Sequence, residues 1–191
     1  QLLNAPGTVD RAKIEVRIRK VLKKLRLKNT LAYKGLVDGL IVIGNGTPDD
    51  AVVTVIAHLL DGRCNAGLLI PTEKGFGAVK HVVHVMRTFS GKPVAFVIDQ
   101  EDMELEDLYR RITKKFSKFG VGLELSGGEG RWREFVIDSG SGGSKVIVVV
   151  NGLDGYEVHE IEDHLLALHG IGPEELPTGA KGDHEENNRG R

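Results

Sequence analysis

Residues 92–102 read KPVAFVIDQED, and this stretch decides the fold class. Five apolar residues run from Val94 to Ile98 behind a proline, and they include β-branched and aromatic side chains. A short, uninterrupted apolar run of this kind is typical of a strand that is buried on both faces of a parallel sheet. We therefore predict a central strand here, with polar residues at its carboxyl end.

Three of the four residues after this strand are acids, namely Asp99, Glu101 and Asp102. Ligands of open α/β sheets bind outside the carboxyl ends of the strands. Neighbouring carboxylates repel one another, and a hard divalent cation with oxygen ligands relieves that repulsion. The same residues would also suit the start of a helix, with Asp99 as N-cap and the later acids favoured by the helix dipole. The local sequence leaves both interpretations open.

The composition indicates one globular domain with short appendages. The chain has 191 residues, of which 40% are hydrophobic and 28% are charged, and this is an ordinary size for one domain. No apolar run reaches the roughly 18 residues that a membrane span needs. The single cysteine, Cys64, excludes an internal disulfide and a cysteine-rich zinc site. We expect a cytoplasmic protein that does not enter a membrane.

Charge is distributed unevenly along the chain. Residues 1–35 carry ten Lys or Arg and two acids, a net charge of +8, whereas the rest carries 16 Lys or Arg and 25 acids, a net charge of −9. Residues 10–26 place apolar side chains at helical spacing on an otherwise basic segment. This basic helix would either bind nucleic-acid phosphates or pack on the acidic body. We divide the chain into a basic helix and linker (1–35), an α/β domain (36–170) and a flexible tail (171–191).

Apolar runs alternate with helical patterns along the domain. Strands are expected at 40–43, 67–71, 94–98 and 145–150, and helices near 47–60, 78–89, 103–119 and 158–168. A β-hairpin is expected near 121–137, around the glycine-rich turn 126–130. Strands that alternate with helices predict an α/β fold with a mostly parallel central sheet flanked by helices.

Polar side chains follow three of the predicted strands. Asn45 and Asp49 come after the first strand, and Asn151 and Asp154 come after the last. Because the carboxyl ends of parallel strands share one edge of the sheet, we expect these side chains to lie near Asp99.

In their order and spacing, these motifs resemble the Toprim domain of topoisomerases, primases and related nucleases. That family has a strand ending in Glu-Gly-x-x-Asp, then a glycine-rich turn, then a strand ending in Asp-x-Asp. The corresponding segments here are 45–49 (NGTPD), 74–78 (KGFGA) and 99–101 (DQE), and 161–164 (IEDH) resembles a late acidic pair of small archaeal and nuclease-type members. The resemblance implies a Rossmann-like sheet, Mg²⁺ or Mn²⁺ as cofactor, and nucleic acid as partner.

The resemblance also implies roles for individual residues. Position 45, Asp99 and Glu101 would be the catalytic positions, and the metal ligands would come from Asp49, Asp99, Glu101, Asp102, Glu162 and Asp163. Asn45 departs from the family, which has a glutamate there. An amide oxygen can still coordinate a metal, but it cannot exchange a proton near neutral pH. Metal binding would therefore survive more readily than catalysis.

Lys74, Gly75 and Gly77 belong to a strand-to-helix turn that would suit a bound phosphate. Neither this turn nor the one at 44–46 matches a Walker A or dinucleotide fingerprint. Three functions stay open: a Mg²⁺-dependent nuclease-like or primase-like protein, a catalytically degenerate Toprim-like interaction module, and a nucleotide- or phosphate-binding regulatory domain. The sequence also leaves open DNA against RNA, and a homodimer against a monomer.

Overall fold

The computed structural model describes residues 37–46, 48–53, 66–137, 143–156 and 159–173. Its elements are β1 (Gly39–Ile43), β2 (Ala66–Leu69), the 3₁₀ turn η2 (Gly75–Ala78), α3 (Val79–Thr88), β3 (Val94–Asp99), α4 (Leu105–Lys118), β4 (Leu123–Gly127), β5 (Trp132–Ile137), β6 (Ser144–Asn151) and α5 (Ile161–Leu168). Residues 49–53 are also helical. The basic helix predicted at 10–26, Cys64 and most of the predicted tail lie outside the described residues.

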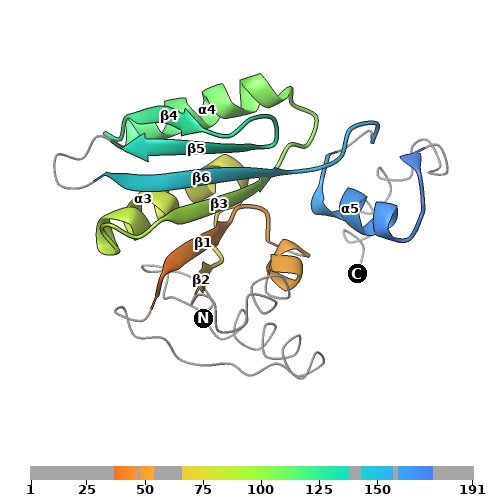
Figure 1. Cartoon of the computed structure of the whole chain (residues 1–191), viewed down its shortest axis with the longest axis horizontal. Coiled ribbons are helices and arrows are strands. Elements are labelled where there is room, and N and C mark those ends of the chain that lie inside the picture. Colours follow the sequence, from red (N-terminus) through yellow and green to blue (C-terminus); the bar gives the residue numbers. More distant parts are fainter. Residues whose placement is uncertain (1–36, 47, 54–65, 138–142, 157–158, 174–191) are drawn as a thin grey trace, which may run out of the picture.

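Six strands form one mixed sheet in the order β2-β1-β3-β6-β5-β4 (Figure 1). The first four are parallel, whereas β5 and β4 form an antiparallel hairpin that pairs with β6. This confirms the predicted α/β fold with a mostly parallel sheet and a hairpin near 121–137. The four parallel strands end at the same edge of the sheet, and α5 lies beyond that edge (Figure 1).

Helices α3 and α4 pack on one face of the sheet and enclose the apolar core (Figure 1). Alternate residues of β3 and β6 are buried there, including Phe96 and Val148. Helix α4 contributes Leu108, Ile112 and Phe116, which are spaced four residues apart and so share one side of the helix. The opposite side of α4 carries most of its charged residues.

The helix after the central strand begins later than the capping interpretation requires. Strand β3 continues through Asp99, and α4 begins at Leu105 with Glu104 as its N-cap. The interpretation of Asp99 as a helix N-cap is therefore wrong. Between the two elements, Gln100 Nε2 donates a hydrogen bond to the Met103 carbonyl (2.6 Å), which holds a turn. Helix capping therefore does not explain why Asp99 lies at the sheet edge.

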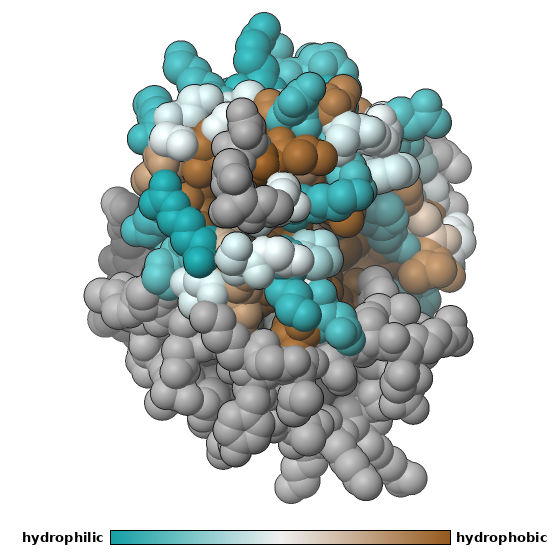
Figure 2. All heavy atoms as spheres, turned by 60° about the vertical axis from the view of Figure 1, so that its left-hand side comes forward, coloured by the Kyte–Doolittle hydropathy of each residue, from teal (hydrophilic) through white to brown (hydrophobic). Residues whose placement is uncertain are grey.

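Figure 2 shows the side of the molecule that lies at the left of Figure 1. Hydrophilic side chains surround the described part of this surface, and apolar side chains cluster among them. Among the helices of the described residues, none combines the length and the apolar composition that a membrane span requires.

Phe116→Ala should lower the free energy of unfolding by about 3–5 kcal/mol, because it removes a fully buried ring between α4 and the sheet. Denaturant unfolding measures the loss. Lys118→Ala, at an exposed position of the same helix, is the control and should change the value by about 0.5 kcal/mol or less. Similar losses in both variants would contradict the packing described for α4.

Candidate functional site

One side-chain amide joins two buried carboxylates at the carboxyl edge of the sheet. Strands β3 and β6 pair in parallel, so Asp99 and Asn151 lie side by side at their ends. The Asn151 Nδ2 group donates one hydrogen bond to Asp99 Oδ1 (2.9 Å) and another to Asp49 Oδ1 (2.7 Å). Asp49 begins the helical segment that follows β1. Three segments that are far apart in the sequence therefore meet at Asn151.

Asn45 completes the connection between the first and third strands. Its Oδ1 accepts a hydrogen bond from the backbone N–H of Asp99 (3.1 Å). Its Nδ2 donates to Glu101 Oε1 (3.4 Å). Both ends of the amide are therefore engaged, and Glu101 is drawn toward the loop after β1. The structure thus brings Asn45, Asp49, Asp99 and Glu101 together, as their positions after neighbouring strands led us to expect.

The two aspartates are strongly desolvated. Asp49 is 2% exposed and Asp99 is 8% exposed. Burial raises the pKa of Asp99 to about 7 and the pKa of Asp49 to about 6, because it disfavours the charged form. The nearby negative charge of Glu162 raises both pKa values further, while the Asn151 hydrogen bond opposes the shift of the Asp99 pKa. Both raised pKa values mean that the surroundings stabilise the charged carboxylates less well than water does.

Glu101 is held in an unusual backbone conformation. Among the described residues it is the only one other than glycine with a positive φ, at 56°. Its N–H donates to the His159 carbonyl (3.0 Å), and the His159 N–H donates back to the Glu101 carbonyl (3.3 Å). A left-handed backbone is unfavourable for a residue with a Cβ and persists where neighbouring contacts hold it. The segment before α5 therefore fixes where the Glu101 side chain projects.

The backbone pairing of Glu101 with His159 is accompanied by a close approach of the chain at Gly152. Gly152 has φ 118°, and a Cβ there would lie 2.3 Å from the Cβ of His159. Only glycine fits such a position. The His159 Nδ1 atom also lies 2.7 Å from the Leu153 carbonyl. The loop after β6 therefore folds back on itself at the residue that pairs with Glu101.

The late acidic pair divides between two environments. Asp163 is buried, and its Oδ2 accepts hydrogen bonds from the backbone N–H groups of Glu160 (3.0 Å) and Leu153 (3.4 Å). It forms a capping box with Glu160 at the start of α5. Glu162 is half-buried, and its charge acts on both Asp49 and Asp99. Of this pair, Glu162 is the one with an electrostatic connection to the two aspartates.

The glycine-rich turn lies beside the loop after β1. The Gly75 N–H donates to the Gly44 carbonyl (2.9 Å). A Cβ on Gly46 would lie 3.5 Å from Lys74 Cε and 3.9 Å from Lys74 Nζ. The Lys74 amine is therefore next to Asn45 at the carboxyl edge. Gly77 lies farther along the turn, where a Cβ would meet the Glu73 side chain.

The predicted ligand Asp102 is more peripheral, as are two residues near the glycine-rich turn, Lys80 and His81. Asp102 is exposed in the turn that follows β3. Lys80 forms an ion pair with Glu73 on the turn and α3. His81 is buried in α3. These positions do not join Asn151 through any hydrogen bond found in the described part of the chain.

Arg131 also supports the site, through hydrogen bonds from the hairpin turn, and the sequence did not predict this role. Its guanidinium donates to Gln100 Oε1 (2.7 Å), to the Asn151 carbonyl (3.5 Å) and to Asp154 Oδ1 (2.7 Å). It thereby ties the hairpin to the ends of β3 and β6. No local signal identifies this role, because Arg131 lies in a hairpin turn and its partners are 20 to 31 residues away.

The donor chemistry of the edge suits a hard cation. Carboxylate and amide oxygens are the ligands that Mg²⁺ and Mn²⁺ accept. As the side chains stand, no three His, Cys, Asp or Glu within the described ranges are grouped so that they could hold one ion. In this arrangement the Asn151 NH₂ group lies against both aspartates. A cation would therefore require Asn151 to turn its amide oxygen inward and one of the neighbouring acids to approach.

Comparison of the chain with protein-family models, with curated proteins and with solved structures gives no significant match. The functional argument therefore rests on the geometry of this edge.

In a chelating buffer, Asp99→Asn should become more stable relative to the parent protein as the pH rises. The gap is the free energy of unfolding of Asp99→Asn minus that of the parent. The pKa of Asp99 is raised by folding from 3.8 to about 7, so the unfolded chain loses this proton first. The contribution of Asp99 to the parent's free energy of unfolding should therefore fall as the pH rises from about 4 to about 7. Between pH 5 and pH 8 the gap should grow by on the order of 2–3 kcal/mol, at about 1.4 kcal/mol per pKa unit.

Denaturant unfolding at several pH values measures this gap. Asp102→Asn removes an exposed carboxylate from the same turn and is the matched control. A gap for Asp99→Asn that stays constant across the range would show that the folded protein does not shift the pKa of this carboxyl.

Proposed function

We propose that the carboxyl edge of the sheet binds Mg²⁺ or Mn²⁺ and that the protein uses this ion to bind and process nucleic acid. One observation carries the proposal: two buried carboxylates, from Asp49 and Asp99, are held against a single amide at the strand ends. Burying a second carboxylate beside the first is unfavourable unless a cation or several donors compensate. Among the described residues, Asn151 is the side chain that donates a hydrogen bond to both.

The proposed ligands are Asp49, Asp99 and Glu101, with Glu162 as a further charge. Asn45 positions two of them, because it holds the Asp99 backbone and the Glu101 carboxylate. Asn151 would exchange its donor group for its amide oxygen when the ion enters. A divalent ion held in this way neutralises charge on a phosphodiester and lowers the pKa of bound water.

Lys74 would meet the phosphate. Its amine lies beside Gly46, which neighbours Asn45, and it is exposed to solvent. A lysine acts on phosphate as a point charge, so it would orient a substrate without contributing to proton transfer at neutral pH. The resemblance of the motifs to the Toprim domain supports nucleic acid as the substrate, with nuclease-like or primase-like chemistry.

A second candidate is a catalytically degenerate Toprim-like module that binds a partner without chemistry. The specific observation that favours it is the pair of asparagines. Asn151 donates one hydrogen bond to Asp49 and one to Asp99, and Asn45 donates one to Glu101, so each carboxylate has an amide donor without an ion. An amide at position 45 also supplies no proton donor or acceptor for catalysis.

Thermal unfolding with and without millimolar Mn²⁺ should separate the two candidates. An ion that binds only the folded protein at about 100 times its Kd stabilises it by about 2.7 kcal/mol. We expect this stabilisation in the parent protein, its loss in Asp99→Asn, and its retention in Asp102→Asn. No stabilisation of the parent by Mn²⁺ or Mg²⁺ would favour the interaction module.

Cleavage of labelled single- and double-stranded DNA and RNA in Mn²⁺ then tests the chemistry. Asn45→Glu restores an ionisable group at the position where the Toprim family has glutamate. We expect it to raise Mn²⁺-dependent cleavage by about tenfold or more, consistent with the 10²–10⁴-fold range of general acid–base catalysis. Asn45→Gln is the control of the same size without the charge. Equal cleavage by both variants would remove position 45 from the mechanism.

A further inference from the structure

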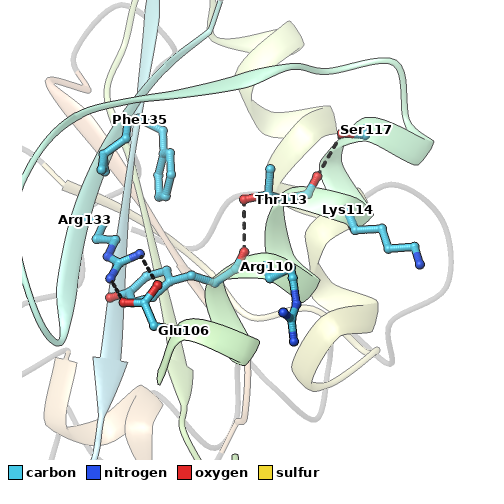
Figure 3. A pocket seen from close by; sticks show the side chains of 9 residues that line it. Glu106, Arg110, Thr113, Lys114, Ser117, Arg133 and Phe135 are labelled. Carbon is cyan, nitrogen blue, oxygen red and sulfur yellow. Dashed lines mark hydrogen bonds and ion pairs between the residues drawn. The ribbon is translucent and has the colours of Figure 1, made fainter. Parts of the chain in front are cut away.

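A second surface of the protein lies on the hairpin, away from the acidic edge. Helix α4 and the two hairpin strands leave a hollow of about 440 Å³ between them. Tyr109, Arg110 and Lys114 line it from the helix, and Leu125, Arg133 and Phe135 line it from the sheet (Figure 3). None of these six residues takes part in the site around Asn151.

The floor of the hollow is apolar and its internal polar groups are satisfied. Leu125 is 54% exposed there, which is high for a large aliphatic side chain on a sheet. Arg133 makes a two-pronged ion pair with Glu106 and lies 4.1 Å from the centre of the Tyr109 ring (Figure 3). The Tyr109 hydroxyl donates to the Gly130 carbonyl (2.9 Å). What the floor offers to a partner is therefore chiefly the Leu125 side chain.

The rim of the hollow is basic. Arg110 and Lys114 lie one turn apart on α4, with their charged ends toward solvent (Figure 3). Within the described ranges, Arg110 pairs with Asp107 on its own helix; this pair is exposed, and exposed pairs are weak. No ion pair of Lys114 is found in the described ranges. Glu106 also lines the hollow, but it is paired with Arg133, so Arg110 and Lys114 leave the lining with a net positive charge that attracts negative charge.

The sheet also ends here. Strand β4 is the last in the strand order, and its outer edge has no strand beside it in the described part of the chain (Figure 1). An outer edge presents backbone N–H and C=O groups that can pair with another strand. Leu123 and Leu125 point to the α4 side of this strand, whereas Glu124 and Ser126 point away. A strand added at this edge would place every second side chain over the hollow.

We propose that β4 and the hollow bind an extended, acidic peptide segment of a partner protein by strand addition. An aliphatic side chain of that segment packs against Leu125. An acidic side chain two residues away faces Arg110 and Lys114, because residues two apart share one face of a strand. The backbone pairing supplies affinity, and the alternate side chains supply specificity.

The same rim could attract a nucleic-acid backbone, but the floor favours a peptide. Single-stranded nucleic acids bind by stacking bases on exposed aromatic rings as well as by charge. Tyr109 is 3% exposed and Phe135 is 5% exposed, so neither offers an open ring face. An aliphatic side chain beside an unpaired strand edge is the recognition surface of a peptide.

The proposal is tested by selecting, from a displayed library of random peptides of about nine residues, those that bind the full chain. We expect enriched peptides to combine an aliphatic and an acidic residue two positions apart. A synthetic copy of the enriched sequence should lose at least about tenfold in affinity, about 1.4 kcal/mol, against Arg110→Glu/Lys114→Glu and against Leu125→Asp. Lys118→Glu makes the same charge change on the same helix outside the hollow and should stay within about twofold.

Hydrogen exchange of the complex adds a readout of strand pairing. The backbone amides of β4 should gain protection when the peptide binds, because the added strand occupies the outer edge. Failure of the library to enrich, or enrichment of peptides that bind the double variant equally well, would overturn the proposal. So would a single-stranded oligonucleotide that binds this face without protecting β4, or a dimer of the parent protein that Leu125→Asp dissolves.

Discussion

The hydrogen bonds of one amide, that of Asn151, connect the segments that form the candidate site. Two carboxylates, from Asp49 and Asp99, are buried at the carboxyl edge of the sheet, and each needs a donor to offset its loss of hydration. Asn151 provides a donor to both because β6 runs parallel to β3 and ends level with it. Asn45 then binds the backbone of Asp99 and the side chain of Glu101. The loops after three strands are arranged around this network.

The network also contains a backbone conformation that is unusual for a residue with a side chain. Glu101 adopts a left-handed backbone, and Gly152 admits a close approach of His159 that any side chain would block. Strain of this kind persists where surrounding contacts over-determine it, and it concentrates at functional sites. Arg131 adds a brace from the hairpin. The acidic edge is thus rigidly built, although its charge is only partly compensated.

The molecule presents two surfaces of contrasting character. The carboxyl edge concentrates carboxylates around Asp99, whereas the outer side of α4 concentrates Arg and Lys near the hairpin hollow. The hairpin connects them, since Arg131 contacts the acidic edge while Arg133, two residues later, closes the floor of the hollow. Arg131 lies in the turn just before β5 and Arg133 lies within the strand, so the two side chains reach different places although they are only two residues apart.

The sequence by itself determined the α/β class, the central strand, the hairpin and the presence of Asn45, Asp49 and Asp99 at strand ends, because these follow from local periodicity and from the shared edge of parallel strands. It left both a metal ligand and a helix cap open for Asp99, and only the extension of β3 and the later start of α4 excluded the cap. Tertiary structure alone decided that Asn151 bridges the acids, that Arg131 braces them and that Leu125 remains exposed over a hollow. Those features depend on strand order, register and helix placement, and such contacts between distant residues leave no periodic trace in the chain.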